Sequence, residues 1–415
     1  MYLPDSEAST SVKGCTRGTH RVVPPSETLA RVAPVMQRAG ITRVGVISGL
    51  DHVGLPVVTV YRPNARSLAV SQGKGLDLDA ARASGIMEAI ESWHAEHVTV
   101  PLVHASWAEL QHTRPVVDVT RLPQLTVSTF HPHKPLLWAE GHDLIAGGSV
   151  WVPYEMVHTN FSLPLPAGSG SFVMSSNGLA SGNHPLEAIV HGICEVVERD
   201  ANALWFASGA DSRAARRVAL ASVDDPDCQK VLGLFAAADL AVAVWDTTTD
   251  VGIASFRCVV ADRHPNVFRQ LYAVDGSGTH PARGIALLRA LTEAAQCRLT
   301  YISGTRDDGD RAFFERVRHP DVVGRALREI VDTAPTRPFT GVPTHDAETC
   351  ADDVAWACAR LVDVAIDEVV VVDLTRPDVD IPVVRVIVPG LESLHDAPGY
   401  VAGPRAHAVA SPAPS

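Results

Sequence analysis

The stretch GICEVVERDAN, residues 192–202, constrains the fold more than any other part of the sequence. It sets Glu195 and Glu198 three residues apart among isoleucine and valine, inside a segment whose apolar pattern predicts a helix over 185–207. Carboxylates on a packed helix lose their hydration unless they protonate, meet a cation or bind a metal ion. The stretch therefore raises the question of what neutralises these two side chains.

The segment GIMEAIESWHA, residues 85–95, repeats the arrangement within a helix predicted over 79–96. At about 100° per residue, Ser84, Glu88 and Glu91 fall within an arc of about 60° on that helix. Mg²⁺ prefers carboxylate, water and phosphate oxygens, so it is the ion that these helices indicate. The alternative to a metal site is that these glutamates lie on a solvated acidic face and form structural ion pairs. On the helix over 185–207, an arc of about 80° holds Glu187, His191, Glu195 and Glu198, and Arg199 follows.

A third predicted helix, over 284–301, places Arg289, Glu293 and Gln296 on one arc of about 60°. The arginine could bridge phosphate oxygens, or could form an ordinary surface pair with the glutamate four residues on. The remaining helices are predicted at 26–39, 226–238, 312–331 and 350–364, and strands at 56–61, 150–157, 253–261, 369–374 and 382–388. This mixture indicates an α/β or α+β fold.

Two loops supply further candidate ligands. In SQGKG, residues 71–75, Lys74 lies between glycines that would let the backbone approach a phosphate, although such a lysine often marks only a turn. In SGNHPLEA, Asn183 could cap the helix that follows or reach a metal ion or nucleotide. The chain contains no GxxxxGK[ST] motif and no GxGxxG between a strand and a helix, so a P-loop or dinucleotide fold is not predicted.

Composition excludes several classes of protein. A net charge of −12 argues against nucleic acid or an anionic membrane as a partner, and no apolar run reaches the roughly 18 residues of a membrane span. Seven scattered cysteines without a CxxC pair predict reduced thiols. With no secretory signal at the N-terminus, we expect a cytoplasmic protein. We expect a mobile segment over 1–20, one interlocked unit over 21–400 and a flexible tail over 401–415.

Three blocks of the sequence, together and in this order, resemble the signature blocks of the YcaO family. They are SQGKGLDLDAARASGIMEAIESWHAE, GLASGNHPLEAIVHGICEVVERDAN and ARGIALLRALTEAAQCRLTYISGTRDD, and PVVRVIVPGLE follows near the end. The resemblance covers about residues 10–395. It implies an ATP-binding fold without a P-loop, in which helices bearing carboxylates hold Mg²⁺ against the triphosphate.

The resemblance also implies a role for each candidate residue, while the residue that acts chemically stays unassigned. Metal ligands, or their supports, would be Glu88, Glu91, Glu187, Glu195, Glu198 and Glu293. Contacts to the nucleotide or its phosphates would come from Lys13 in KGCTRGTHR and from Lys74, Ser84, Asn183, Arg199, Arg289 and Gln296.

Proteins of this family activate a backbone amide of a peptide by phosphorylating its carbonyl oxygen. Attack by a side chain of the peptide then gives an azoline, attack by sulfide gives a thioamide, and attack by an amine gives an amidine. The tail SPAPS departs from the PxPxP ending of many azoline-forming members, and no leader-binding domain precedes the first block. The KGxxxGTHR opening is similar to members that work with a TfuA-type partner, so thioamide formation on a ribosomally made peptide is favoured.

Other readings stay open at this point. A separate protein could deliver the peptide substrate, and a homodimer is expected. From other classes come an ATP-dependent carboxylate–amine ligase and a partner that binds nucleotide and peptide without catalysis.

Overall fold

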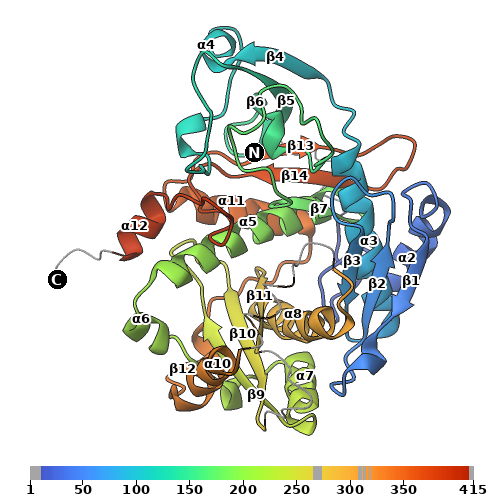
Figure 1. Ribbon diagram of the computed structural model, residues 1–415, viewed down its shortest axis with the longest axis vertical. Coiled ribbons are helices and arrows are strands. Elements are labelled where there is room, and N and C mark those ends of the chain that lie inside the picture. The colour runs from blue at the N-terminus through green and yellow to red at the C-terminus, as the bar shows by residue number, and fades with distance from the viewer. Residues whose placement is uncertain are drawn as a thin grey trace.

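Two units of the same topology form a large part of the fold. In each, three antiparallel strands follow one another and lead, through a short turn, into a long helix. The first contains β1 (Arg43–Val46), β2 (Val57–Tyr61), β3 (Val70–Lys74) and α3 (Leu78–Glu96). The second contains β9 (Leu240–Asp246), β10 (Ser255–Asp262), β11 (Val274–Thr279) and α8 (Arg283–Ser303). Figure 1, a ribbon diagram of the computed structural model, shows them at the right and at the bottom.

The structure describes residues 11–264, 273–306, 311, 315, 317 and 319–410. Within this part of the chain, a six-stranded sheet lies beside the two repeated units, at the top of Figure 1. Its order is β4-β5-β13-β14-β7, with β6 paired to β5, and every pairing is antiparallel. The strands are β4 (Leu102–Ser106), β5 (Pro135–Asp143), β6 (Ser149–Pro153), β7 (Leu179–Ser181), β13 (Val370–Asp373) and β14 (Val383–Ile387).

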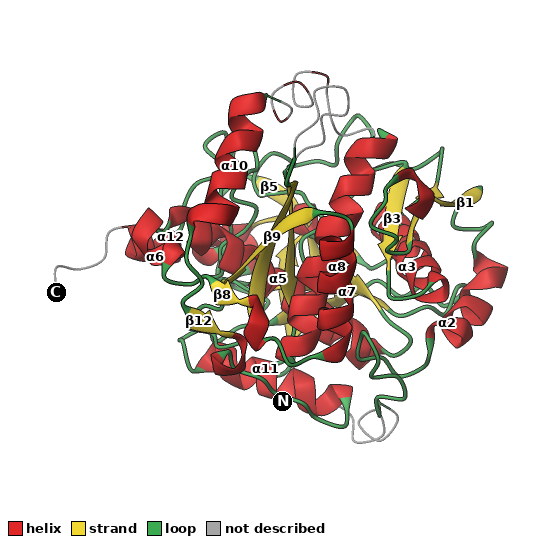
Figure 2. Ribbon diagram, turned by 90° about the horizontal axis from the view of Figure 1, so that it is seen from below, coloured by secondary structure: helices red, strands yellow, loops and turns green. Residues whose placement is uncertain are grey.

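Helix α5 (Pro185–Ala207) joins these parts, because it contacts β14 and β7 of the six-stranded sheet and also β11 of the second unit. It is almost wholly buried, with α11 (Cys350–Val362) packed against it. Figure 2 shows the helices gathered around the strands of the second unit. The other elements are α2 (Pro25–Val32), α4 (Trp107–Leu110), α6 (Ala210–Ala214), α7 (Pro226–Ala237), α10 (Pro320–Asp332), α12 (Pro404–Ala410), β8 (Val218–Ala219) and β12 (Arg337–Pro338).

Glycines bring the helices of the two repeated units against their strands. A Cβ atom at Gly73 of β3 would lie 2.2 Å from the backbone nitrogen of Gly85 of α3. A Cβ atom at Gly278 of β11 would lie 2.1 Å from the carbonyl oxygen of Ala286 of α8. At such separations no larger residue fits without moving the helix. These contacts therefore fix where α3 and α8 place their polar residues.

The mixture of helices and antiparallel sheets confirms the predicted fold class, and most predicted segments correspond to observed elements. Two boundaries were wrong. The helix expected over 26–39 ends at Val32, because Pro34 follows within the 3-10 turn Ala33–Val35. The strand expected over 150–157 ends at Pro153, which leads into a 3-10 turn. The segment predicted as helical over 312–331 lies partly outside the described residues, and α10 begins at Pro320.

The expectation of mobile ends does not hold where the structure describes them. In the segment predicted as mobile over 1–20, Ser11 is fully buried and Lys13 forms a buried ion pair with Asp353 over 2.8 Å. In the expected tail over 401–415, residues 404–410 form α12, and Arg405 pairs with the buried Asp200 over 2.9 Å. Long-range ion pairs of this kind cannot be recognised from local composition.

All seven cysteines lie in the described part of the chain and all are free thiols, as predicted. Among the described helices, none is both long and apolar enough to cross a membrane.

Candidate active site

Helices α3, α5 and α8 each present a triplet of side chains with the same spacing. Each of these helices contacts the strand that leads into another of them. Helix α3 contacts β7, which precedes α5; α5 contacts β11, which precedes α8; and α8 contacts β3, which precedes α3. Each triplet follows the pattern i, i+4, i+7, which lies on one helical face. The triplets are Ser84, Glu88 and Glu91 on α3, His191, Glu195 and Glu198 on α5, and Arg289, Glu293 and Gln296 on α8.

The five glutamates of these triplets form one electrostatic group, here called the acid cluster: Glu88, Glu91, Glu195, Glu198 and Glu293. Burial, together with the charges of Glu88 and Glu195, raises the pKa of Glu91 to about 8. Burial likewise raises the pKa of Glu88 and of Glu195 to about 7 each. These carboxylates therefore act on one another electrostatically, and the prediction that they face one shared cavity stays a prediction.

Cations neutralise part of the acid cluster. Lys74 Nζ donates to Oε2 of Glu293 over 2.7 Å, and this ammonium holds the pKa of Glu293 below its ordinary value in spite of burial. Burial raises the pKa of the neighbouring Glu198, and the charge of Glu293 adds to that effect. Arg199 lies 3.8 Å from Glu195 on the same helix. Glu293 and Glu195 thus each have a cation beside them.

Several buried polar atoms at this place have no hydrogen-bond partner among the described residues. They include Oε2 of Glu198, which has no hydrogen-bond donor, and Nε of Arg199 and of Arg289, which have no acceptor. A bare carboxylate oxygen suits Mg²⁺, and bare guanidinium N–H groups suit phosphate oxygens. The donor set thus fits a magnesium nucleotide, in which glutamates of the acid cluster would hold Mg²⁺ and the two arginines and Lys74 would contact the phosphates.

Within the described residues, no three His, Cys, Asp or Glu side chains are grouped closely enough to hold a metal ion by themselves. This arrangement is compatible with Mg²⁺, which usually binds one or two carboxylates and completes its shell with water and substrate phosphates. The assignment of individual glutamates as metal ligands stays a prediction.

Glu187 lies apart from the acid cluster. Its two oxygens accept hydrogen bonds from the backbone nitrogens of Val22 (2.8 Å) and Asn183 (3.0 Å), and from Arg21 Nη1 (3.2 Å). It lines a small pocket with Arg21, His191 and Arg289. Because its oxygens are already occupied by donors, the geometry gives no support to Glu187 as a metal ligand.

The pocket beside Glu187 adjoins the acid cluster through Arg289, whose Nη2 lies 3.3 Å from His191 Nε2. Burial and the nearby arginines lower the pKa of His191 well below its ordinary value, so its ring is neutral. Lys13 does not line this pocket itself, and its ammonium pairs with the lining residue Asp353. Lys13 Nζ also donates to the carbonyl oxygen of Ala347 over 2.7 Å.

The remaining predicted contacts to the nucleotide are Asn183, Ser84 and Gln296. The cap of α5 is His184, whose side chain accepts from the backbone nitrogen of Leu186, so the alternative that Asn183 caps this helix is wrong. Asn183 instead donates to Glu187. Ser84 and Gln296 are half-buried on the faces of α3 and α8 that carry Glu88 and Glu293. Their roles as contacts to the nucleotide stay predictions.

The analysis of the sequence missed three polar residues at the acid cluster. Ser181 of β7 donates to Glu91 from its backbone nitrogen (3.0 Å) and from Oγ (2.6 Å). Arg385 of β14 is fully buried, and the acidic charges that act on it are those of Glu195 and Glu91. Arg306 is the cation with most influence on Glu88. An arginine inside the apolar strand PVVRVIV was a visible signal for Arg385.

Comparison with known proteins assigns the family. The family model described as the YcaO cyclodehydratase, ATP- and Mg²⁺-binding, matches residues 72–392. The chain therefore belongs to the YcaO family, and it is an ATP-dependent enzyme that uses ATP and Mg²⁺. The predicted family, enzyme class and cofactors are confirmed.

Relatives of similar length support this assignment. A protein of Rhizobium leguminosarum bv. trifolii, described as lying in the tfuA 3′ region, is 36% identical over 379 residues, covering 90% of this chain and 88% of the relative. A protein of Methanothermobacter thermautotrophicus is 34% identical over 401 residues, covering 90% of this chain and 95% of the relative.

Two solved structures share the fold. YcaO from Methanopyrus kandleri, bound with AMPPCP and Mg²⁺, superposes with a TM-score of 0.73 at 22% identity, covering 95% of this chain and 98% of that one. A heterocyclase in complex with substrate and cofactor superposes with a TM-score of 0.75 at 22% identity. It matches 92% of this chain, which spans about half (54%) of the heterocyclase chain.

Proposed function

We propose that this enzyme uses ATP and Mg²⁺ to activate the carbonyl oxygen of a backbone amide in a ribosomally made peptide, and that sulfide replaces this oxygen. The observation that carries the activation step is the acid cluster, in which Oε2 of Glu198 is buried without a donor beside two arginines with unused N–H groups. Such a site suits a magnesium triphosphate, whose cations and anions satisfy both kinds of group.

Hydrosulfide adds to the amide carbon, and the carbonyl oxygen takes the terminal phosphoryl group of ATP, which releases ADP. The C–O bond then breaks, phosphate leaves with the former amide oxygen, and the sulfur loses its proton to give C=S. Lys74, Arg199 and Arg289 would stabilise the charge that shifts among the phosphate oxygens during this transfer. Holding the amide beside the phosphate would supply much of the remaining acceleration.

Sulfide as the nucleophile is supported by the relative from the tfuA 3′ region. A TfuA-type protein is accordingly proposed as the partner, with a peptide as the substrate. The resemblance to a heterocyclase favours the second candidate, in which a side chain of the peptide attacks and an azoline forms.

Mass spectrometry of the peptide product separates the candidates. The purified enzyme is mixed with Mg²⁺, ATP, sulfide, the TfuA-type protein and a peptide encoded beside the gene. Exchange of one oxygen for one sulfur is expected, with ATP consumption that depends on the peptide. Loss of one water would identify azoline formation instead. No change in the peptide mass under any of these conditions would contradict amide activation itself.

A further inference from the structure

Strand β7 ends at Ser181, and both donors of this residue bind the same oxygen of Glu91. The backbone nitrogen donates to Oε1 over 3.0 Å, and Oγ donates to Oε1 over 2.6 Å. The second distance is typical of a hydroxyl bound to an ionised carboxylate. Ser181 is 2% exposed, so water does not compete for either bond. One oxygen of Glu91 is therefore fixed to the end of β7.

Ser181 is itself held in a rigid part of the fold. It pairs with Val383 of β14, and the backbone nitrogen of the following Gly182 donates to the carbonyl oxygen of Pro382 over 3.1 Å. A Cβ atom at Gly182 would lie 2.7 Å from the backbone nitrogen of Ala188 in α5. The strand thus runs from β14 closely into α5, and the two donors on Glu91 belong to this framework.

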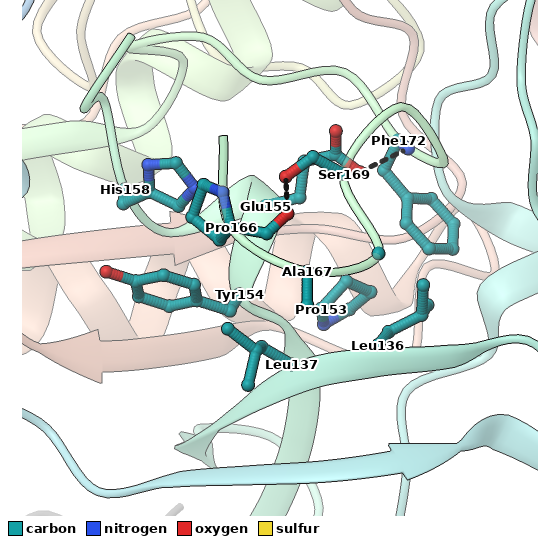
Figure 3. A pocket seen from close by; sticks show the side chains of 11 residues that line it. Leu136, Leu137, Pro153, Tyr154, Glu155, His158, Pro166, Ala167, Ser169 and Phe172 are labelled. Atoms are coloured by element: carbon teal, nitrogen blue, oxygen red, sulfur yellow. Dashed lines mark hydrogen bonds between the residues drawn. The ribbon is translucent and has the colours of Figure 1, made fainter. Parts of the chain in front are cut away.

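Glutamates with a structural role in this protein have both oxygens occupied. In the described part of the chain, the buried glutamates outside the acid cluster accept hydrogen bonds at Oε1 and at Oε2; they are Glu96, Glu155, Glu187 and Glu392. Figure 3 shows Glu155 joined in this way to Phe172. A carboxylate that serves only to tie segments together is therefore satisfied at both of its oxygens.

Glu91 departs from this rule. Among the described residues, the hydrogen bonds that it accepts all go to Oε1, which leaves Oε2 without a donor. The charges of Glu88 and Glu195 act on the same carboxylate. Neighbouring negative charges favour a cation at an oxygen that no donor occupies.

A carboxylate held in this way can bind a metal ion through one oxygen only. Oε1 has two lone pairs, and the two donors of Ser181 occupy both of them. Mg²⁺ binds in a strict octahedral geometry with one or two carboxylates, whereas Ca²⁺ takes about six to eight oxygens and often both oxygens of one carboxylate. Binding of Ca²⁺ through both oxygens of Glu91 would displace the hydrogen bonds from Ser181.

We propose that Ser181 is a positioning residue for the metal ion: it restricts Glu91 to a single free oxygen and so favours Mg²⁺ over Ca²⁺ at the acid cluster. The inference rests on the proposed function, in which Glu91 is one of the glutamates that would hold the ion. It adds a residue outside the three helices that selects which ion is held. Hydrogen-bond partners of metal ligands commonly orient them in this manner.

A second serine of the chain makes an equivalent contact away from the acid cluster. Ser106 donates to Oε2 of Glu109 from its backbone nitrogen (3.0 Å) and from Oγ (2.7 Å), as the cap of α4. Glu109 is not a member of the acid cluster. Ser106→Ala is therefore the matched control, because it removes the same kind of hydroxyl–carboxylate bond where no metal ion is expected.

The test compares two ions in the absence of peptide. Binding of a non-hydrolysable ATP analogue is measured by calorimetry with excess Mg²⁺ and with excess Ca²⁺, and the wild type should bind more tightly with Mg²⁺. Ser181→Ala should bind about tenfold more weakly with Mg²⁺ and no more weakly with Ca²⁺. Ser181→Thr, which keeps the hydroxyl, and Ser106→Ala should both retain the preference of the wild type.

The isosteric pair Ser181→Thr and Ser181→Val repeats the comparison at equal side-chain volume if melting temperatures show that Ser181→Ala is not folded during the titration. Equal binding with the two ions by the wild type would overturn the inference. An unchanged preference in the folded variant without the hydroxyl, or equal losses with both ions, would also overturn it. A purely structural hydrogen bond would lower the melting temperature without changing the ratio of the two affinities.

This outcome is separable from that of the proposed function, because the titrations contain neither peptide nor sulfide. A reduced preference for Mg²⁺ in Ser181→Ala supports the positioning role even when no peptide is modified. Modification of a peptide by the wild type, together with an unchanged ion preference in Ser181→Ala, supports the function and refutes the positioning role.

Discussion

Lys74 Nζ donates a hydrogen bond to Oε2 of Glu293 over 2.7 Å, and this contact joins the end of β3 to the middle of α8. It connects the two repeated units directly at the acid cluster. Lys74 therefore binds Glu293 in the protein without nucleotide, and we propose that it binds a phosphate when ATP is present.

Replacing Lys74 with methionine should destabilise the protein without metal, because Glu293 loses its compensating charge. We expect a loss of about 1–2 kcal/mol, since both side chains are partly exposed. Mg²⁺ should restore more of the melting temperature in this variant than in the wild type. Arg82→Met is the control on α3, because its ion pair with Asp79 is exposed. A deficit in Lys74→Met that Mg²⁺ leaves unchanged would mean that the ion does not reach Glu293.

Glu198→Gln should abolish ATP consumption and yet raise the melting temperature of the metal-free protein at neutral pH. The substitution removes a buried charge whose Oε2 has no partner. Each kcal/mol of repulsion relieved corresponds to a rise of roughly 2–4 °C. Differential scanning fluorimetry and an ADP-release assay measure the two effects.

Glu96→Gln is the matched contrast, since it lies at the end of α3 and is compensated by the buried Arg62 and by Ser67. It should lower the melting temperature, because it leaves an arginine without its charge partner. If Glu198→Gln instead behaves like Glu96→Gln, the carboxylate of Glu198 has a structural partner and the magnesium assignment fails there.

The acid cluster should make the metal-free protein less stable as the pH rises. The pKa values of Glu88 and Glu195 (about 7) and Glu91 (about 8) exceed the ordinary 4.5, so the folded state binds more protons than the unfolded chain within that window. Stability should therefore fall from about pH 5 to about pH 8 and level off above it. Bound Mg²⁺ and nucleotide should reduce this fall.

The same linkage predicts that binding of the magnesium nucleotide releases protons. Calorimetry at pH 7 in two buffers of different ionisation enthalpy should detect roughly one to two protons released for each nucleotide bound. Proton uptake, or a melting temperature that rises with pH in the metal-free protein, would contradict this prediction. It would show that these carboxylates are already ionised at pH 7 before Mg²⁺ and nucleotide bind.

Arg405→Ala should destabilise the protein by about 3–5 kcal/mol, because Asp200 is fully buried and loses its charge partner. Asp200 follows Arg199 directly on α5, so a lower affinity for ATP is also expected at temperatures below unfolding. Denaturant unfolding and nucleotide binding measure the two effects. The double variant Asp200→Asn with Arg405→Met should recover much of the loss, and a stability of Arg405→Ala equal to the wild type would contradict the buried pair.

Much of the fold could be predicted from local pattern. The segments over 185–207 and 79–96 correspond to α5 and α3 within one residue, because their apolar residues recur at the helical period. Sheet order could not be predicted in this way, since the pairing of β14 with β7 joins residues about 200 positions apart. The repeat of three strands and a helix was also missed, because the sequence likeness of α3 is to α5 rather than to α8.

The site was predictable to the extent that its residues share a helical face. Glu88, Glu195 and Glu293 were predicted as site residues because each is the middle member of three polar residues spaced i, i+4, i+7 on a helix that is otherwise largely apolar. Glu187 fulfilled the same pattern, yet its oxygens face donors from Val22 and Asn183. A pattern on a helix gives the direction of a side chain, whereas its partner depends on tertiary contacts that the pattern does not contain.

The close fit of Gly73 to Gly85 and of Gly278 to Ala286 implies that the spacing of the charged groups is governed by residues that carry no charge. A single added methyl group at Gly278 would push a whole helix outward and take Arg289, Glu293 and Gln296 with it. Surveys that search for inactivating changes only among acidic and basic positions would overlook the glycines on which the spacing of these charged groups depends.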